Sequence, residues 1–187
     1  MESTTVYFEN TGPENTERAL EIAAKRADEL GIDTILVAST GGATGQRALE
    51  LFKGKRVIVV SHTHGFKAAD ESEMEAAARA NLEAKGAIVL TAAHAFGGVS
   101  RAIRRKLETS TGGDLIANTL RTLGQGMKVA CEIVLMAADA GLVRTDETVI
   151  CIGGSGRGAD TVITTRPVNS DLYFDLRVQE ILCKPHF

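Results

Sequence analysis

The chain has 187 residues, about one domain's length, and its 21 Lys and Arg against 24 Asp and Glu give a formal net charge of −3. This balance excludes a nucleic-acid binder that works through net charge, and 44% apolar residues exclude a disordered chain. Glycine is in excess, at 19 residues against 3 prolines, where average usage predicts about 13 glycines.

Strand-like apolar runs alternate with longer helical segments along most of the chain. The expected strands are residues 6–9, 34–40, 56–62 and 87–93, and the expected helices are 14–31, 46–54, 71–86, 99–107 and 115–140. Three further strands are expected at 148–154, 159–168 and 172–185, with only loops between them. Repeated strand–helix units are typical of a parallel sheet with helices on both faces.

We therefore expect one domain, residues 1–187, with a three-layer α/β/α fold. Its sheet is mostly parallel, and the late strands, which have no helices between them, form an antiparallel edge.

Three cysteines, Cys131, Cys151 and Cys183, lie in apolar runs. An odd number without close pairing predicts free thiols in a reducing compartment. The first ten residues lack the basic start and apolar core of a secretory signal. The longest apolar stretch, 129–138, is interrupted by Glu132 and is too short to span a bilayer. We expect a soluble cytoplasmic protein without membrane contact.

Polar and glycine residues gather where the strands end. Ligands of open α/β sheets bind outside the carboxyl ends of the strands, and ten of the nineteen glycines and three of the four histidines fall there. The candidate ligand-binding residues are Ser39, Thr40, Gly41, Gly42, Thr44, Gly45, His62, His64, Gly65, Phe66, His94, Phe96, Gly97, Gly98, Gly154, Ser155, Gly156, Arg157, Asp160 and Thr161.

The segment STGGATG, residues 39–45, carries the most information. Its glycines let backbone N–H groups turn toward one point, and a following helix N-terminus favours an anion. The alternative is a tight turn in which Ser or Thr caps the helix. If the segment is an anion site, a phosphate or a carboxylate would suit it. The sequence alone does not decide between the anion site and the capped turn.

The segment GGSGRGAD, residues 153–160, superficially fits a dinucleotide fingerprint. That fingerprint requires a helix next, whereas the β-branched run DTVITTRPV follows, so we reject a Rossmann site. Two interpretations of this segment remain: it is a solvated turn, or it is a hairpin loop that carries Arg157 toward an anion.

Three histidines are candidate catalytic groups. His62, His64 or His94 could act as a general acid or base near neutral pH, and as a set they could bind a metal ion. No acidic residue or cysteine stands at an obvious ligand spacing, so we expect no metal site. Lys128 and Glu132, at i,i+4 spacing in an apolar helix, indicate a structural pair or an interface contact.

Two segments resemble the C-terminal domain of pyruvate kinase. ERALEIAAKRADELGIDTILVASTGGATGQRALELFKGKRVIVVSH is similar to the opening of that domain, and GLVRTDETVICIGGSGRGADTVITTRPV is similar to its last β-hairpin. The likeness covers about residues 14–62 and 141–168. The chain is identified as a member of the stand-alone pyruvate kinase C-terminal domain-like family, found largely in archaea and some bacteria.

The resemblance implies a three-layer α/β fold and a site that in many pyruvate kinases holds a sugar-phosphate effector. Its phosphate loop would fall on Ser39, Thr40, Gly41, Gly42 and Thr44. The resemblance also implies flavin mononucleotide (FMN) as a ligand.

FMN needs an apolar slot beside its phosphate cradle, and Phe66, Phe96, His64 and His94 would line it. The catalytic barrel of pyruvate kinase has no counterpart in the sequence, so we expect no phosphotransfer from phosphoenolpyruvate.

Three functions follow as hypotheses. The first is a protein that binds a small phosphorylated ligand, FMN above all. The second is an enzyme that uses His62, His64 or His94 on a phosphorylated metabolite. The third is a regulatory module that acts on a partner through the small-residue helix expected over residues 115–140. Separately, we expect the protein to form a homo-oligomer.

Overall fold

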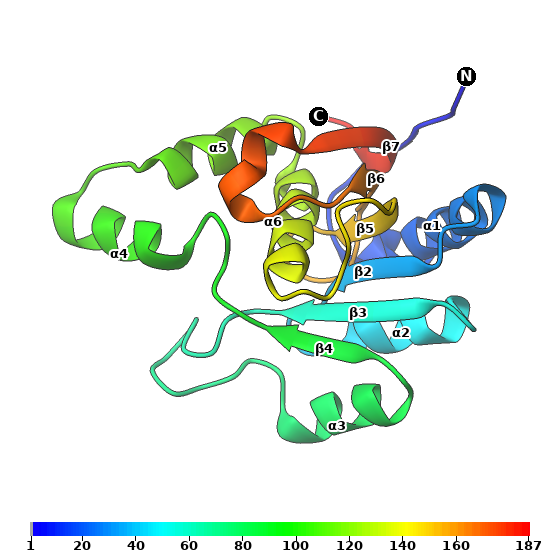
Figure 1. Cartoon of the computed structure of the whole chain (residues 1–187), viewed down its shortest axis with the longest axis horizontal. Helices are drawn as coiled ribbons and strands as arrows, with labels where there is room; N and C mark the ends of the chain where they lie inside the picture. Colours follow the sequence, from blue (N-terminus) through cyan, green and yellow to red (C-terminus); the bar gives the residue numbers. More distant parts are fainter. Residues whose placement is uncertain (1) are drawn as a thin grey trace.

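A seven-stranded mixed sheet organises the computed structural model, which describes residues 2–187 (Figure 1). The strands are β1 (Val6–Phe8), β2 (Thr34–Ala38), β3 (Arg56–Ser61), β4 (Ile88–Thr91), β5 (Val149–Gly153), β6 (Thr161–Arg166) and β7 (Arg177–Pro185). Their order in the sheet is β1-β7-β6-β5-β2-β3-β4. The helices are α1 (Thr16–Leu30), α2 (Ala43–Leu51), α3 (Ala76–Ala84), α4 (Gly98–Leu107), α5 (Gly112–Arg121) and α6 (Gln125–Asp139), with short 3-10 turns η1 (Pro13–Asn15) and η2 (Ser170–Asp175).

Strand directions confirm the expected fold class. Strands β5, β2, β3 and β4 run parallel to one another, whereas β6 is antiparallel to both β5 and β7. The outermost strand on that side is β1, which pairs parallel with β7. The sequence pattern did not predict this contact between the first and last strands.

Helices cover both faces of the sheet and make two cores. Along β2, Ile35 and Val37 pack in the core that α1, α2 and α3 share, whereas Leu36 packs in the core under α6. A strand buried on both faces reads as a continuous apolar run rather than an alternating one. The sequence TILVA therefore specifies a central position in the sheet.

The prediction of a single helix over residues 115–140 is wrong. The segment contains two helices, α5 and α6, and the backbone between them reverses at Gly124, whose φ is 115°. L side chains rarely adopt this conformation, and glycine adopts it without steric cost. Most of α6 is buried, so the small residues of this segment pack inside the molecule.

Two other boundaries differ from the expectation. The helix expected over 71–86 begins only at Ala76, because residues 62–75 form a long irregular loop. The strand expected from residue 172 begins at Arg177, after the 3-10 turn η2. In both cases the residues just before the helix or strand have the same sequence pattern as the element itself: helix-favouring residues before α3 and apolar residues before β7. The pattern therefore places the start of each element too early.

The parallel register brings the carboxyl ends of three strands to one edge. Ala38 of β2 pairs with Val60 of β3, and Ser61 of β3 pairs with Thr91 of β4. The arrowheads of β3 and β4 in Figure 1 point toward the side on which α4 lies, and α4 and α5 extend there as an arm. The loops after these strands therefore meet under this arm.

Among residues 2–187, no helix is long and apolar enough to cross a membrane. The three cysteines are free and buried, as the sequence predicts. Burial raises the pKa of the Cys131 and Cys183 thiols to about 12, and it raises that of Cys151 as well.

We expect these thiols to be inert in the folded protein, since the thiolate is the reactive form. Titration with a thiol-specific disulfide reagent at pH 8 is expected to detect no reactive cysteine in native protein and all three in denaturant. Rapid reaction of a native thiol would contradict the burial.

A second prediction concerns the contact between α6 and β5. A Cβ placed on Gly153 would lie 2.3 Å from the Gly126 carbonyl oxygen, which is backbone and cannot rotate away. Gly153→Ala is expected to lower the free energy of unfolding by about 1–3 kcal/mol, measured by urea denaturation. Gly112→Ala is the matched control, because no atom lies within 4 Å of its added Cβ, and an unchanged or higher stability is expected for it.

Candidate functional site

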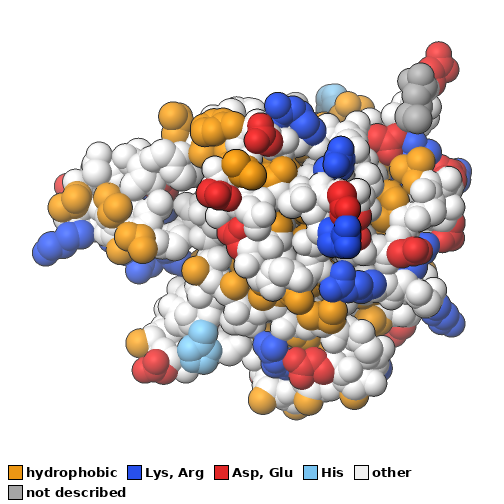
Figure 2. All heavy atoms as spheres, in the orientation of Figure 1, with side chains coloured by type: hydrophobic (Ala, Val, Ile, Leu, Met, Phe, Trp, Pro, Cys, Tyr) orange, Lys and Arg blue, Asp and Glu red, His pale blue; other side chains and the backbone are white. Residues whose placement is uncertain are grey.

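A cleft of about 540 Å³ opens at the carboxyl ends of β2 and β3. Its walls come from the loop before α2, the ends of β3 and β4, the helices α4 and α6, and the loop between β5 and β6. Figure 2 shows the surface hollowed between the α4–α5 arm and the lower part of the molecule.

Eleven of the twenty predicted ligand-binding residues line this cleft. They are Ser39, Thr40, Gly41, Thr44, His62, Phe66, His94, Gly97, Gly154, Gly156 and Arg157. The cleft therefore brings together residues from four separate loops. The remaining nine candidates lie around it rather than in its lining.

The loop before α2 offers a set of unused backbone donors. Ser39 Oγ accepts a hydrogen bond from the Gly45 N–H in the first turn of α2 at 3.2 Å, whereas the N-cap residue itself is Gly42, which has no side chain to cap the helix. In the described chain, no protein atom accepts a hydrogen bond from the N–H groups of residues 40–44. These amides lie at the N-terminus of α2, where partial positive charge favours an anion.

Arg157 extends from the β5–β6 loop toward the same place. Its Nη1 atom lies 3.8 Å from the position that a Cβ on Gly41 would take. Its Nη2 atom lies 3.7 Å from Glu73 Oε1, while the side chain stays 64% exposed. A guanidinium beside open amides forms a site with anion-binding chemistry.

Asp160 and Thr161 hold this loop and do not line the cleft. The fully buried Asp160 carboxylate accepts hydrogen bonds from the N–H groups of Gly12 and Ser155 and from the Thr161 hydroxyl. The segment after the loop is the strand β6, which agrees with rejecting a dinucleotide fingerprint there.

Three rings form one wall of the cleft. The centroid of His62 lies 4.2 Å from that of Phe66 and 5.3 Å from that of His94. The Arg101 guanidinium of α4 lies 4.0 Å over the Phe66 ring. The wall therefore has an aromatic surface with a cation stacked over one of its rings.

The two histidines differ in their hydrogen bonds. His62 Nδ1 lies 2.6 Å from Glu73 Oε2, and this hydrogen bond lowers the pKa of the Glu73 carboxyl. His94 Nε2 accepts a hydrogen bond from the Thr63 N–H at 3.3 Å. Burial lowers the pKa of His94, against the opposing effect of Glu132, so His94 is neutral at pH 7.

Lys128 and Glu132 form a buried ion pair at the base of the cleft. Glu132 also accepts a hydrogen bond from the Phe96 N–H at 3.0 Å, and its Oε2 atom lies 4.0 Å from His94 Nδ1. Burial lowers the pKa of Lys128, whereas Glu132 raises it. The expected pairing of these residues is present, and it faces the cleft.

The cleft is basic although the chain is acidic. Five of its lining residues are Arg or Lys and one is Glu, against the net charge of −3 for the chain. Arg104 pairs with Asp114, whereas the hydrogen bonds of Arg121 go to the neutral oxygens of Gln125 and Asn118. The positive charge is therefore only partly compensated.

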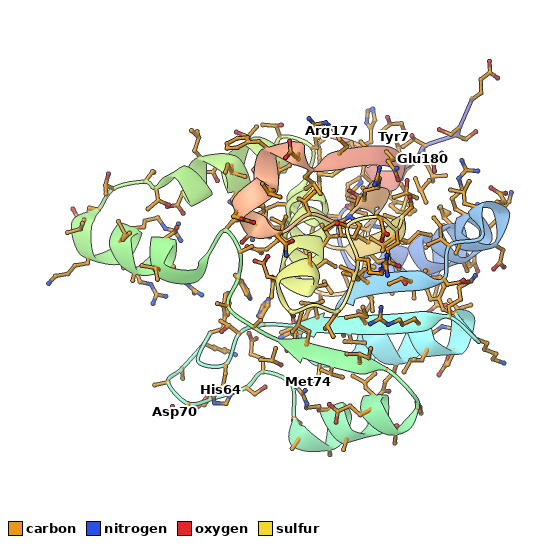
Figure 3. All side chains as sticks on the ribbon, viewed as in Figure 1. Tyr7, His64, Asp70, Met74, Arg177 and Glu180 are labelled. Atoms are coloured by element: carbon orange, nitrogen blue, oxygen red, sulfur yellow. The ribbon has the colours of Figure 1, made fainter. Side chains whose placement is uncertain are left out.

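The other candidates lie outside the cleft lining. Figure 3 shows His64 beside Asp70 at the outer end of the 62–75 loop. Phe96 is buried under the arm, where its ring lies 5.4 Å from that of Tyr173. Glycines and one serine make up the rest: Gly42, Gly65 and Ser155 lie in loops, whereas Gly45 and Gly98 lie at the starts of α2 and α4.

Sequence reasoning missed several residues that line the cleft or contact its lining. Glu73 was expected inside a helix, and only the structure shows that its loop returns to His62. One feature of the sequence points to Lys128 and Glu132: they form a charged pair in an otherwise apolar helix. No feature of the sequence points to Arg121 and Gln125, because they lie at the facing ends of α5 and α6, where the chain turns at Gly124.

Within residues 2–187, no group of three or more His, Cys, Asp or Glu side chains is placed to hold a metal ion.

A comparison with protein families agrees with this architecture. The family model described as pyruvate kinase, alpha/beta domain, matches residues 17–164. This range includes the strands β2 to β5, the first four residues of β6, and all six α-helices but the first residue of α1. The fold has the mostly parallel sheet and antiparallel late strands expected from the resemblance. The chain therefore belongs to the pyruvate kinase alpha/beta domain family.

Proposed function

We propose that the chain binds a small phosphate-bearing molecule in the cleft, and that FMN is this ligand. The observation that carries the proposal is the set of unused N–H groups of residues 40–44 beside the Arg157 guanidinium. Backbone donors at a helix N-terminus and a planar cation together match the oxygens of a phosphate group.

The rest of the cleft fits a flat ring system. Val129, Ile133 and Met136 of α6 contribute to the lining, as do Phe66 and His62 of the 62–75 loop. A cleft of about 540 Å³ lies within the range of cofactor sites, roughly 300–1,000 Å³. When bound, FMN supplies electron-transfer chemistry, and the residues named here would orient it and exclude water.

Arg157→Gln tests the phosphate site. We expect this change to weaken FMN and inorganic phosphate binding by about tenfold, because one charge-assisted contact is lost. Quenching of flavin fluorescence measures the first affinity and calorimetry the second. Arg56→Gln is the control, since Arg56 begins β3 at the opposite end of the strand, and riboflavin, which lacks the phosphate, is expected to bind Arg157→Gln and the unchanged protein alike.

A pair of substitutions at Gly41 tests the amide cradle. An added Cβ there meets only ordinary contacts, at 3.8 and 3.9 Å, so the fold is expected to survive. Gly41→Asp places a carboxylate beside Arg157 and is expected to weaken phosphate binding more than tenfold, by electrostatic repulsion and by competition for the guanidinium. Gly41→Asn is its neutral isostere, and equal losses in both variants would contradict an anion site.

A further inference from the structure

His62 has one nitrogen committed and one open. Its Nδ1 atom is bound to Glu73 at 2.6 Å, and within residues 2–187 no hydrogen bond is made by its Nε2 atom. The ring lines the cleft with 36% of the side chain exposed. A carboxylate on Nδ1 fixes the tautomer that leaves Nε2 unprotonated, and it stabilises the imidazolium that forms when Nε2 accepts a proton.

His94 cannot take the same role. Its Nε2 atom is occupied by the Thr63 N–H, and its side chain is only 14% exposed. The charged groups around the two rings are Glu73, Glu132, Lys128, Arg101 and, through Glu73, Arg157. His62 is therefore the imidazole of the cleft that can exchange a proton with a bound molecule.

Lys128 provides the complementary group. Lys128 is a lining residue of the cleft, and Glu132 uses one of the three N–H donors of its ammonium. Glu132 is itself held by the Phe96 N–H. An ammonium fixed in a water-poor site stabilises negative charge that develops on a substrate oxygen.

We propose that the cleft catalyses proton transfer at the carbon next to a carbonyl group of a small phosphate ester, with His62 as the base and Lys128 as the electrophile. The proposal rests on the phosphate-binding part of the proposed function and not on the flavin. The unused amides of residues 40–44 and Arg157 anchor the phosphate, while Glu73 and Glu132 are positioning residues.

The step balances without a further reactant. His62 Nε2 accepts the proton from the carbon, and the C–H electron pair becomes the carbon–carbon double bond of an enolate. The carbonyl π electrons move onto the oxygen that faces the Lys128 ammonium. Return of the proton from His62 restores the starting compound, so in D₂O a deuteron takes the place of the abstracted proton.

Hydrogen–deuterium exchange tests the proposal. The full-length protein is incubated in D₂O with triose, tetrose and pentose phosphates that carry a ketone or aldehyde, and proton NMR follows the signal beside the carbonyl. We expect exchange with at least one compound, and a loss of about 100-fold or more in His62→Gln. His64→Gln, two residues away on the outside of the loop, is the matched control and is expected to keep the full rate.

The positioning role of Glu73 has a separate signature. Glu73→Gln is expected to lower the exchange rate about tenfold and to alter its pH profile, because the group facing Nδ1 no longer carries charge. Glu71→Gln, an exposed carboxylate of the same loop, is expected to change neither.

The outcomes separate this inference from the proposed function. Absence of exchange with every compound, or equal rates in His62→Gln and the unchanged protein, overturns the inference, whereas Arg157-dependent phosphate binding then still supports the proposed function. Absence of phosphate binding as well overturns both.

Discussion

The close approach of α6 to the ends of β5 and β6 is the contact on which the cleft depends. A Cβ on Gly126 would lie 2.2 Å from Thr161 Oγ1, and one on Gly153 would lie 2.3 Å from the Gly126 carbonyl oxygen. Only glycine fits at such distances. Asp160 accepts three hydrogen bonds beside this contact, from Gly12, Ser155 and Thr161, and so joins the N-terminal segment to the Arg157 loop next to the start of α6. The same contact sets where Lys128 and Glu132 enter the cleft.

Much of the fold follows from residue pattern alone. The run TILVA predicts a strand buried on both faces, and the β-branched run after the GGSGRG loop predicts a strand where a dinucleotide site needs a helix. The pairing of β1 with β7 could not be predicted, because an apolar strand does not specify its neighbour. The low helix propensity of Gly124 and Gly126 indicates that the expected helix can bend there, but the tertiary contact at Gly126 decides that it divides into two helices.

The candidate site, like the fold, can be predicted from the sequence only in part. Glycine, hydroxyl and histidine residues at strand ends are visible in the sequence because a parallel sheet brings such ends to one edge. The partners that give them chemical character are not visible. Glu73 reaches His62 through an irregular loop, and the Lys128–Glu132 pair reaches His94 from across the sheet edge. These contacts depend on the paths of the loops, which the local sequence pattern does not encode.

The arm built by α4 has a consequence for access to the cleft. Along the described stretch Gly98–Leu107 no residue is buried, and the Arg101 guanidinium over Phe66 is a contact between this helix and the 62–75 loop. Segments with little buried surface open locally at far lower free energy than the core. If the cleft binds a ligand as proposed, local opening of this one short helix is expected to set the rate of entry and exit, while the sheet beneath it stays folded.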